Sequence, residues 1–285
     1  MGLSTSFRHW INLPLAKANL RLETLTAAKF EKERVRKLVD RGYFQEPAFP
    51  LLDSFASFEA TPMVDAYASF GDDCRRLLAP DANANRYDPA NEYFTPADAC
   101  PTYLIARAFK PRLWLEVGSG NSTKVARQAI DDGKLGAKLI CVDPWPRTDI
   151  TAVADEFIRN EAQTLDPSDI VERLHANDVL FIDSSHDLKT GGDVCHLLLN
   201  VVPRLRPGVL LHLHDVFLPY DYPQAWIESG WNWSEQYLVQ AMLQFGGRFQ
   251  VIWPGYYVQK SRPDIMAKLD FLKRGTAQSL WLRTP

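Results

Sequence analysis

Four short runs of apolar residues constrain the fold of this chain most, at residues 113–117, 138–142, 179–182 and 209–214. Each run has the length of one buried strand, and stretches with helical spacing of apolar residues lie between them. Continuous apolar strands that alternate with helices are typical of a parallel sheet covered on both faces. We therefore predict an α/β fold with a Rossmann-like, mostly parallel sheet and helices on both faces.

The rest of the pattern completes this prediction. Helices are expected at residues 20–39, 63–78, 97–109, 122–132, 192–202 and 235–245. A helix end with a weak third strand is expected within 156–165, a further strand at 249–253, and a last edge strand at 279–282. Ligands bind beyond the carboxyl ends of the strands in such sheets, so the site is expected directly after residues 117, 142, 182 and 213.

A polar loop at residues 81–89 indicates the domain boundary, because it combines Asn83, Asn85 and Pro89 between two patterned regions. We predict that residues 1–84 form a helical cap or an oligomerisation segment. Ordinary helices that cover the edge of the main domain are an equally good interpretation. Residues 85–285 are predicted to form the catalytic domain.

Composition excludes several classes of protein. The net charge of −3 gives no basic footprint for nucleic acid, so a small-molecule partner is expected. The four cysteines are scattered without a CxxC pair, which argues against a disulfide framework or a zinc finger. No signal-peptide pattern is evident, and no apolar stretch approaches the roughly 20 residues of a membrane helix. We expect a cytoplasmic protein with no membrane partner; a homo-oligomer is left open.

A glycine bend follows the first predicted strand, in the sequence EVGSGNST at residues 116–123. Gly118 and Gly120 allow a sharp turn and a close backbone approach to a ligand. The third glycine of a dinucleotide fingerprint is missing, since Thr123 stands there, and no Gly-Lys-Ser/Thr phosphate loop is present. Glu116 would repel a pyrophosphate and suits a cofactor that carries a cationic ammonium group.

A second carboxylate, Asp143, ends the second predicted strand, where it can accept two ribose hydroxyls. The combination resembles class I S-adenosylmethionine-dependent methyltransferases, in which the acidic-x-Gly-x-Gly loop holds the amino acid part of the cofactor. The third glycine often found in that loop is Ser122 here. The resemblance implies S-adenosylmethionine as cofactor and these binding residues: Glu116, Gly118, Ser119, Gly120, Ser122 and Asp143.

Two further strands end in chemically capable side chains, in the runs FIDSSHD at 181–187 and LHLHD at 211–215. Neighbouring parallel strands would bring Asp183, His186, His214 and Asp215 around one opening, where they suit a divalent metal, a general base or both. The Ile-Asp-x-x-His pattern, with a second aspartate after the next strand, is similar to macrocin-type sugar O-methyltransferases of methyltransferase family 24. This likeness spans roughly residues 91–253.

The resemblance implies roles for these residues. Asp183 and Asp215 match metal carboxylates, and His214 stands where the sugar-modifying relatives have a glutamate ligand. Mg²⁺ or another divalent metal is therefore expected at Asp183, His214 and Asp215, although imidazole suits transition metals better than Mg²⁺. His186 matches the general base, with Asp183 as its catalytic partner. His212 lies inside its strand and is expected to be a hydrogen-bonded core histidine.

The expected function is transfer of a methyl group to a hydroxyl of a small molecule, with a sugar or glycosylated metabolite favoured. An aromatic stretch at 217–233 is consistent with stacking on a sugar or with a lid, but packing onto the sheet explains it equally well. One alternative is a non-haem metal oxygenase that uses His186, His214 and Asp215. Another is a module that binds the cofactor without catalysis.

Overall fold

The computed structural model describes residues 5–18, 20, 25–231, 233–246 and 249–285. The chain divides into two compact units, Met1–Ala48 with Tyr222–Asn232, and Phe49–Asp221 with Trp233–Pro285. Every residue predicted to bind the cofactor or a metal lies in the second unit, which is called the sheet unit below.

The first unit is helical. It contains α1 (Thr5–Ala16), α2 (Leu25–Asp40), the short 3₁₀ helix η1 (Tyr43–Gln45) and α9 (Gln224–Glu228). Helix α2 packs against η1 and α9. The helix predicted at 20–39 is α2 and begins at Leu25; residues 21–24 of that prediction lie outside the described residues. Helix α1 was not predicted.

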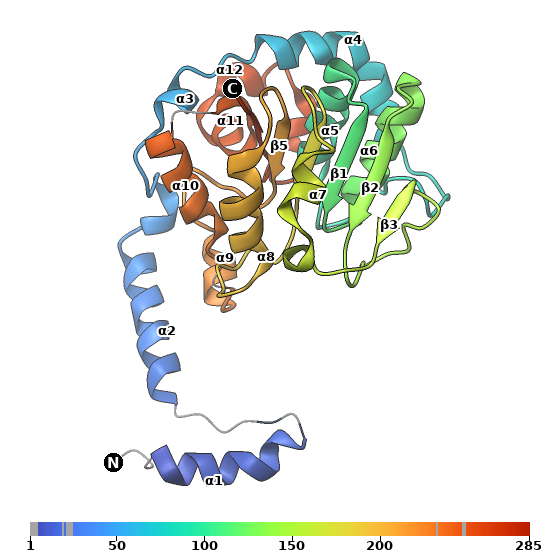
Figure 1. The fold of residues 1–285 in the computed structure, drawn as a ribbon. Helices are drawn as coiled ribbons and strands as arrows, with labels where there is room; N and C mark the ends of the chain where they lie inside the picture. Colours follow the sequence, from blue (N-terminus) through green and yellow to red (C-terminus); the bar gives the residue numbers. More distant parts are fainter. Residues whose placement is uncertain (1–4, 19, 21–24, 232, 247–248) are drawn as a thin grey trace. The chain divides into compact units, whose positions relative to one another are not determined.

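The sheet unit is built on seven strands in the order β3-β2-β1-β4-β5-β7-β6 (Figure 1). The strands are β1 (Leu113–Val117), β2 (Lys138–Val142), β3 (Glu156–Ile158), β4 (Val179–Ile182), β5 (Leu210–Leu213), β6 (Gln250–Pro254) and β7 (Leu280–Arg283). The first five are parallel, and β7 pairs antiparallel with both β5 and β6. The prediction of a Rossmann-like, mostly parallel sheet is confirmed.

The apolar runs form the central strands because both faces of these strands are covered. All four residues of β4 are buried, and in β1 and β2 every residue after the first is buried. The ring centroids of Trp114, Phe181 and Trp281, on β1, β4 and β7, lie 5.8–5.9 Å apart. These three rings pack together and form one core across the three strands. This packing fixes the register in which the strand ends, and hence the site residues, meet.

The sheet unit has α-helices before β1 and in the connections between its strands. They are α3 (Asp53–Ala56), α4 (Thr61–Leu77), α5 (Pro96–Phe109), α6 (Asn121–Gly133), α7 (Pro167–Val171), α8 (Asp193–His196), α10 (Glu235–Gly246), α11 (Gly255–Ser261) and α12 (Pro263–Met266). Helix α4 packs on α5, which packs on α6. The predicted boundary after residue 84 therefore falls inside the sheet unit, because α4 belongs to its helical layer. A role of residues 1–84 as cap or oligomerisation segment stays a prediction.

Two connections differ from the prediction. The helix expected at 192–202 is α8 followed by the π-helical turn η3 (Leu197–Val201) and the 3₁₀ turn η4 (Val202–Arg204), where Pro203 has no N–H to continue an α-helix. The helix end expected within 156–165 is wrong: β3 is followed by the 3₁₀ turn η2 (Ala162–Thr164).

The last strand also lies elsewhere than predicted. Residues 279–282 were expected at the edge of the sheet, but β7 runs between β5 and β6, and β6 is the edge strand. The chain reaches β6 first and then returns antiparallel into the gap beside β5. Among the described residues, no helix has the length and apolar character that crossing a membrane requires.

Candidate functional site

The glycine bend connects β1 to α6 and lies against the end of β4. Gly118 has φ of 81°, and its N–H donates to the carbonyl of Val142 at 3.0 Å. A Cβ atom at residue 118 would lie 1.8 Å from the carbonyl oxygen of Asp183, so only glycine fits. A Cβ at Gly120, in contrast, would meet nothing within 4 Å. The backbone at Gly120 therefore faces open space at the carboxyl edge of the sheet.

Glu116 is a fully buried carboxyl directly before this bend. Its Oε1 atom accepts a hydrogen bond from the hydroxyl of Ser122, whereas its Oε2 atom is buried with no hydrogen-bond partner among the described residues. Burial raises the pKa of Glu116 to about 8, although the neighbouring hydroxyl groups of Ser122 and Thr123 oppose the rise. A buried acceptor without a donor is costly in the free protein and fits a ligand that brings a cationic donor.

Asp143 ends β2 and holds the bend from the other side. One carboxylate oxygen accepts both the backbone N–H of Ser119, at 2.9 Å, and its hydroxyl, at 2.8 Å. The other oxygen accepts the N–H of Trp145 at 2.8 Å. Asp143 is half-buried, so its carboxylate is partly accessible. The structure thus brings all six predicted cofactor residues around one turn.

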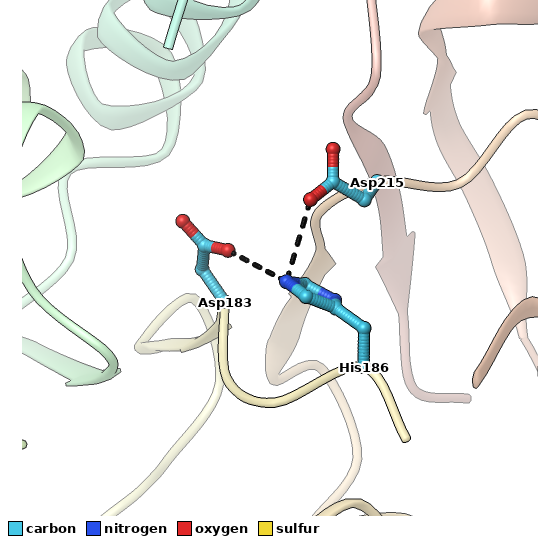
Figure 2. Close-up of side chains that lie close together, drawn as sticks. All are labelled: Asp183, His186 and Asp215. Carbon is cyan, nitrogen blue, oxygen red and sulfur yellow. Dashed lines mark ion pairs between the residues drawn. The ribbon is translucent and has the colours of Figure 1, made fainter. Parts of the chain in front are cut away.

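The second group of predicted residues lies beyond the ends of β4 and β5, and is called the Asp–His cluster: Asp183, His186, His214 and Asp215. Figure 2 shows the carboxylates of Asp183 and Asp215 turned toward the same nitrogen of His186. Nε2 of His186 lies 3.2 Å from Asp183 Oδ1 and 3.3 Å from Asp215 Oδ2. Nδ1 of His214 lies 3.6 and 3.5 Å from the same two oxygens. Asp183, His186 and Asp215 together could hold a metal ion.

Charge in the Asp–His cluster shifts the pKa values of its members. Burial alone would lower the pKa of His186, but hydrogen bonds with Asp183 and Glu235 and the charge of Asp215 raise it to about 10. The carboxylates of Asp215 and Asp183 likewise raise the pKa of His214 against burial. The two imidazoles hold the pKa of Asp183 well below its usual range, although burial opposes them. Without another cation, protons on the imidazoles balance the carboxylate charge at neutral pH.

Two acidic residues at this cluster were not singled out from the sequence, whereas Trp233 belongs to the aromatic stretch that was. Glu235, in the first turn of α10, lies 2.9 Å from Nδ1 of His186 and is buried. Asp98, in the first turn of α5, lies 3.6 Å from Nε2 of His214 and is also buried. The ring of Trp233 lies 4.4 Å from that of His186. An acidic residue in a first helical turn is common at surface helix ends, so the sequence alone gave no signal of these contacts.

His212 is the core histidine that was predicted. Its ring stacks on Phe181 with the ring centroids 3.7 Å apart, and its Nε2 atom lies 2.9 Å from the hydroxyl of Ser279. Burial holds its pKa well below the usual value, so it stays neutral. His212 therefore belongs to the packing behind the site.

Comparison with known proteins adds the class of enzyme. Residues 115–216 match the family model of a methyltransferase domain. No curated protein matches the chain significantly. The fold resembles the methyltransferase PaMTH1 of Podospora anserina bound to SAH, with 16% identity, a TM-score of 0.45, and coverage of 78% of this chain and 96% of that chain. It also resembles a Thermobifida fusca protein assigned as a methyltransferase, with 17% identity, a TM-score of 0.43, and coverage of 80% and 89%.

The matched stretch runs from β1 to the residue after Asp215, and so includes the glycine bend, Asp143 and the whole Asp–His cluster. Residues 115–216 form a methyltransferase domain, as predicted. Asp98 and Glu235 lie outside the match. Since a fold hosts many functions, nothing about the acceptor is taken from the two solved structures.

Proposed function

We propose that this enzyme transfers the methyl group of S-adenosylmethionine to a hydroxyl of a small molecule, with a sugar or glycosylated metabolite as the favoured substrate class. The observation that carries the cofactor site is the buried carboxyl of Glu116, whose Oε2 atom lacks a donor beside a glycine bend that is open at Gly120. The ammonium group of the cofactor would satisfy this oxygen. Asp143 would accept the ribose hydroxyls.

The position of the Asp–His cluster supports transfer at this edge. Asp183 follows β4, and its backbone N–H donates to Val117, the last residue of β1, at 2.9 Å. The cluster therefore lies next to the glycine bend, within the same strand-end edge. Methyl transfer requires an in-line approach of the acceptor oxygen to the sulfonium carbon, so its main demand is positioning.

The hydroxyl must lose its proton as the methyl group moves. Two groups at the cluster can accept it, His186 and Asp183, which are the residues predicted to be catalytic. His186 presents Nε2 to the opening, because Glu235 engages Nδ1. Which of the two acts depends on whether Nε2 of His186 is free, since the protonated imidazole has no lone pair to offer.

The aromatic stretch contributes one residue to this opening in the sheet unit, Trp233, which lies against His186. An indole ring at the entrance favours a flat or ring-shaped acceptor, and sugar rings stack on such surfaces. Tyr220 instead packs on Tyr256, with ring centroids 5.5 Å apart, so part of the stretch serves packing.

The experiment is a transfer assay with methyl-tritiated S-adenosylmethionine and a panel of monosaccharides, glycosides and phenols, with amines and carboxylic acids as contrasts. We expect labelled ethers from the hydroxyl compounds. The Asp183→Asn variant should lose about 100-fold or more of the rate, whereas the nearby Asp187→Asn variant serves as control. Label found only in amines or in base-labile esters would contradict the hydroxyl assignment.

A further inference from the structure

The Asp–His cluster arranges its ligand atoms around a common centre. Each of its two ring nitrogens faces the same two carboxylate oxygens, and the N–O separations are 3.2, 3.3, 3.5 and 3.6 Å. The ligand atoms of Asp183, His186 and Asp215 all lie within 4.8 Å of one another. The ring nitrogens of His186 and His214 therefore flank the same pair of carboxylate oxygens.

These separations are longer than those of strong hydrogen bonds between charged groups, and they suit a shared ion. Charge-assisted N–H···O bonds are about 2.7–2.9 Å long, and the contact between His186 and Glu235 shows that length at 2.9 Å. A metal with bonds of about 2.0–2.2 Å places neighbouring ligand atoms roughly 3–3.6 Å apart. The four N–O separations in the cluster match that spacing.

Both histidines carry a buried carboxylate behind the ring. Glu235 lies 2.9 Å from Nδ1 of His186, which leaves Nε2 for the centre. The carboxylate of Asp98 lies 3.6 Å from Nε2 of His214, and this nitrogen is buried without a hydrogen-bond partner among the described residues. The Oδ2 atom of Asp98 is buried without a hydrogen-bond partner among the described residues. Metal-ligating histidines typically donate their second N–H to such a carboxylate, which fixes the ring and its tautomer.

The backbone conformation of two cluster residues also supports a metal site. His186 has φ of 60° and Asp215 has φ of 55°, in the left-handed region that residues other than glycine rarely adopt. Such a conformation persists mainly where function or surrounding contacts require it. Here the two strained residues are the ones that place a nitrogen and an oxygen at the centre of the cluster.

The donor set does not fit the Mg²⁺ ion implied by the resemblance. Mg²⁺ demands oxygen ligands, whereas half of this set is imidazole nitrogen. We propose that Asp183, His186, His214 and Asp215 form a four-ligand site for a first-row transition-metal dication, with Glu235 and Asp98 as positioning residues. The proposal goes beyond methyl transfer and does not depend on it. With Nε2 of His186 on the metal, the proton-accepting role falls to Asp183.

The test is metal binding by the full-length protein, measured by competition with a chromophoric chelator after removal of metals. We expect one equivalent of Zn²⁺ or Co²⁺ to bind about 100-fold or more tightly than Mg²⁺, because imidazole favours the later metals. Equal affinity for Zn²⁺ and Mg²⁺, or no saturable binding of either, would overturn the proposal.

Conservative variants test the individual residues. Asp98→Asn keeps the Oδ1 acceptor that binds the N–H groups of Gln278 and Ser279 and changes only the oxygen toward His214. This variant and Glu235→Gln should each weaken Zn²⁺ binding about 10–100-fold. His214→Glu should shift the preference toward Mg²⁺. The exposed His175→Gln is the matched control and should bind Zn²⁺ like the parent.

His186→Gln separates this proposal from the proposed function. We expect the Zn²⁺ affinity to fall about tenfold or more, because removal of a metal ligand or of the residue that orients it typically has an effect of this size. Binding of S-adenosylmethionine should be retained. Unchanged Zn²⁺ affinity would refute the four-ligand site, because it would show that Nε2 of His186 does not bind the metal. The proposal of methyl transfer would still stand, with Nε2 free to act as the base. If the parent protein does not bind S-adenosylmethionine, the proposed function is refuted, whereas the proposal of the metal site is not affected.

Discussion

Ser119 directs both of its donors, the backbone N–H and the hydroxyl, at one carboxylate oxygen of Asp143. This pair ties the turn after β1 to the end of β2, so the predicted ribose acid also shapes the loop that would hold the rest of the cofactor. A ligand hydroxyl that reaches Asp143 must share this oxygen with Ser119 or use the oxygen that accepts from Trp145.

The first prediction concerns this acid. Asp143→Asn should weaken S-adenosylmethionine binding about 10–100-fold, because hydrogen bonds to a charged acceptor contribute about 1.5–3 kcal/mol each. Asp149→Asn is the matched control, since Asp149 is exposed and contacts Thr151 only through local hydrogen bonds. Binding calorimetry on the three proteins gives the comparison, and equal affinity of Asp143→Asn and the parent would remove the ribose assignment.

The two glycines of the bend should fail in different ways. Gly118→Ala places a Cβ against the carbonyl of Asp183 at positive φ, so the free energy of unfolding should fall by about 2 kcal/mol or more. Gly120→Ala meets no atom within 4 Å, and its φ of 166° is extended, so stability should stay within about 0.5 kcal/mol of the parent.

The added methyl group at residue 120 should nevertheless weaken binding of the cofactor, because it occupies the side on which the backbone is open. Denaturant unfolding and calorimetry on both variants separate the two effects. A Gly120→Ala protein that binds S-adenosylmethionine normally would place the cofactor elsewhere.

The raised pKa of Glu116 makes stability depend on pH in a defined direction. The folded protein holds this proton up to about pH 8, whereas a free glutamate releases it near its model value of 4.5. Between these pH values the folded state binds more protons than the unfolded state, so the contribution of Glu116 to stability falls as pH rises and levels off above pH 8.

Glu116→Gln removes this titration. The free energy of unfolding of the variant, minus that of the parent, should therefore increase by a few kcal/mol from pH 5 to pH 8 in the absence of cofactor. Urea unfolding at several pH values measures it. A difference that is constant over this range would mean that Glu116 is already ionised in the folded protein.

Sequence patterns predicted the parts of the fold that depend on local burial. Strands β1, β2 and β4 begin and end at the predicted residues, because each is a mainly apolar run between polar turns. The place of β7 between β5 and β6 could not be predicted in this way, since strand order depends on long-range pairing that leaves no local pattern.

In the candidate site, too, some residues could be predicted from local sequence patterns and others could not. Residues at strand ends, such as Asp183 and Asp215, were predicted because parallel strands deliver their ends to one edge. Asp98 and Glu235 come from the first turns of two helices that lie far from the strand ends in sequence, and only the packing of α5 and α10 brings them to His214 and His186. Their acidic character in the sequence is equally typical of ordinary helix starts.

The most direct test of the central claim, that buried Glu116 receives a cationic group of the cofactor, is calorimetry of S-adenosylmethionine binding at pH 7 in two buffers of different ionisation enthalpy. The parent should bind S-adenosylmethionine but not NAD⁺ and release close to one proton, because the bound cation favours the ionised carboxylate. Glu116→Gln should bind about tenfold or more weakly and release no proton from this residue. Equal affinity of the variant and the parent, without a difference in proton release, would contradict the account.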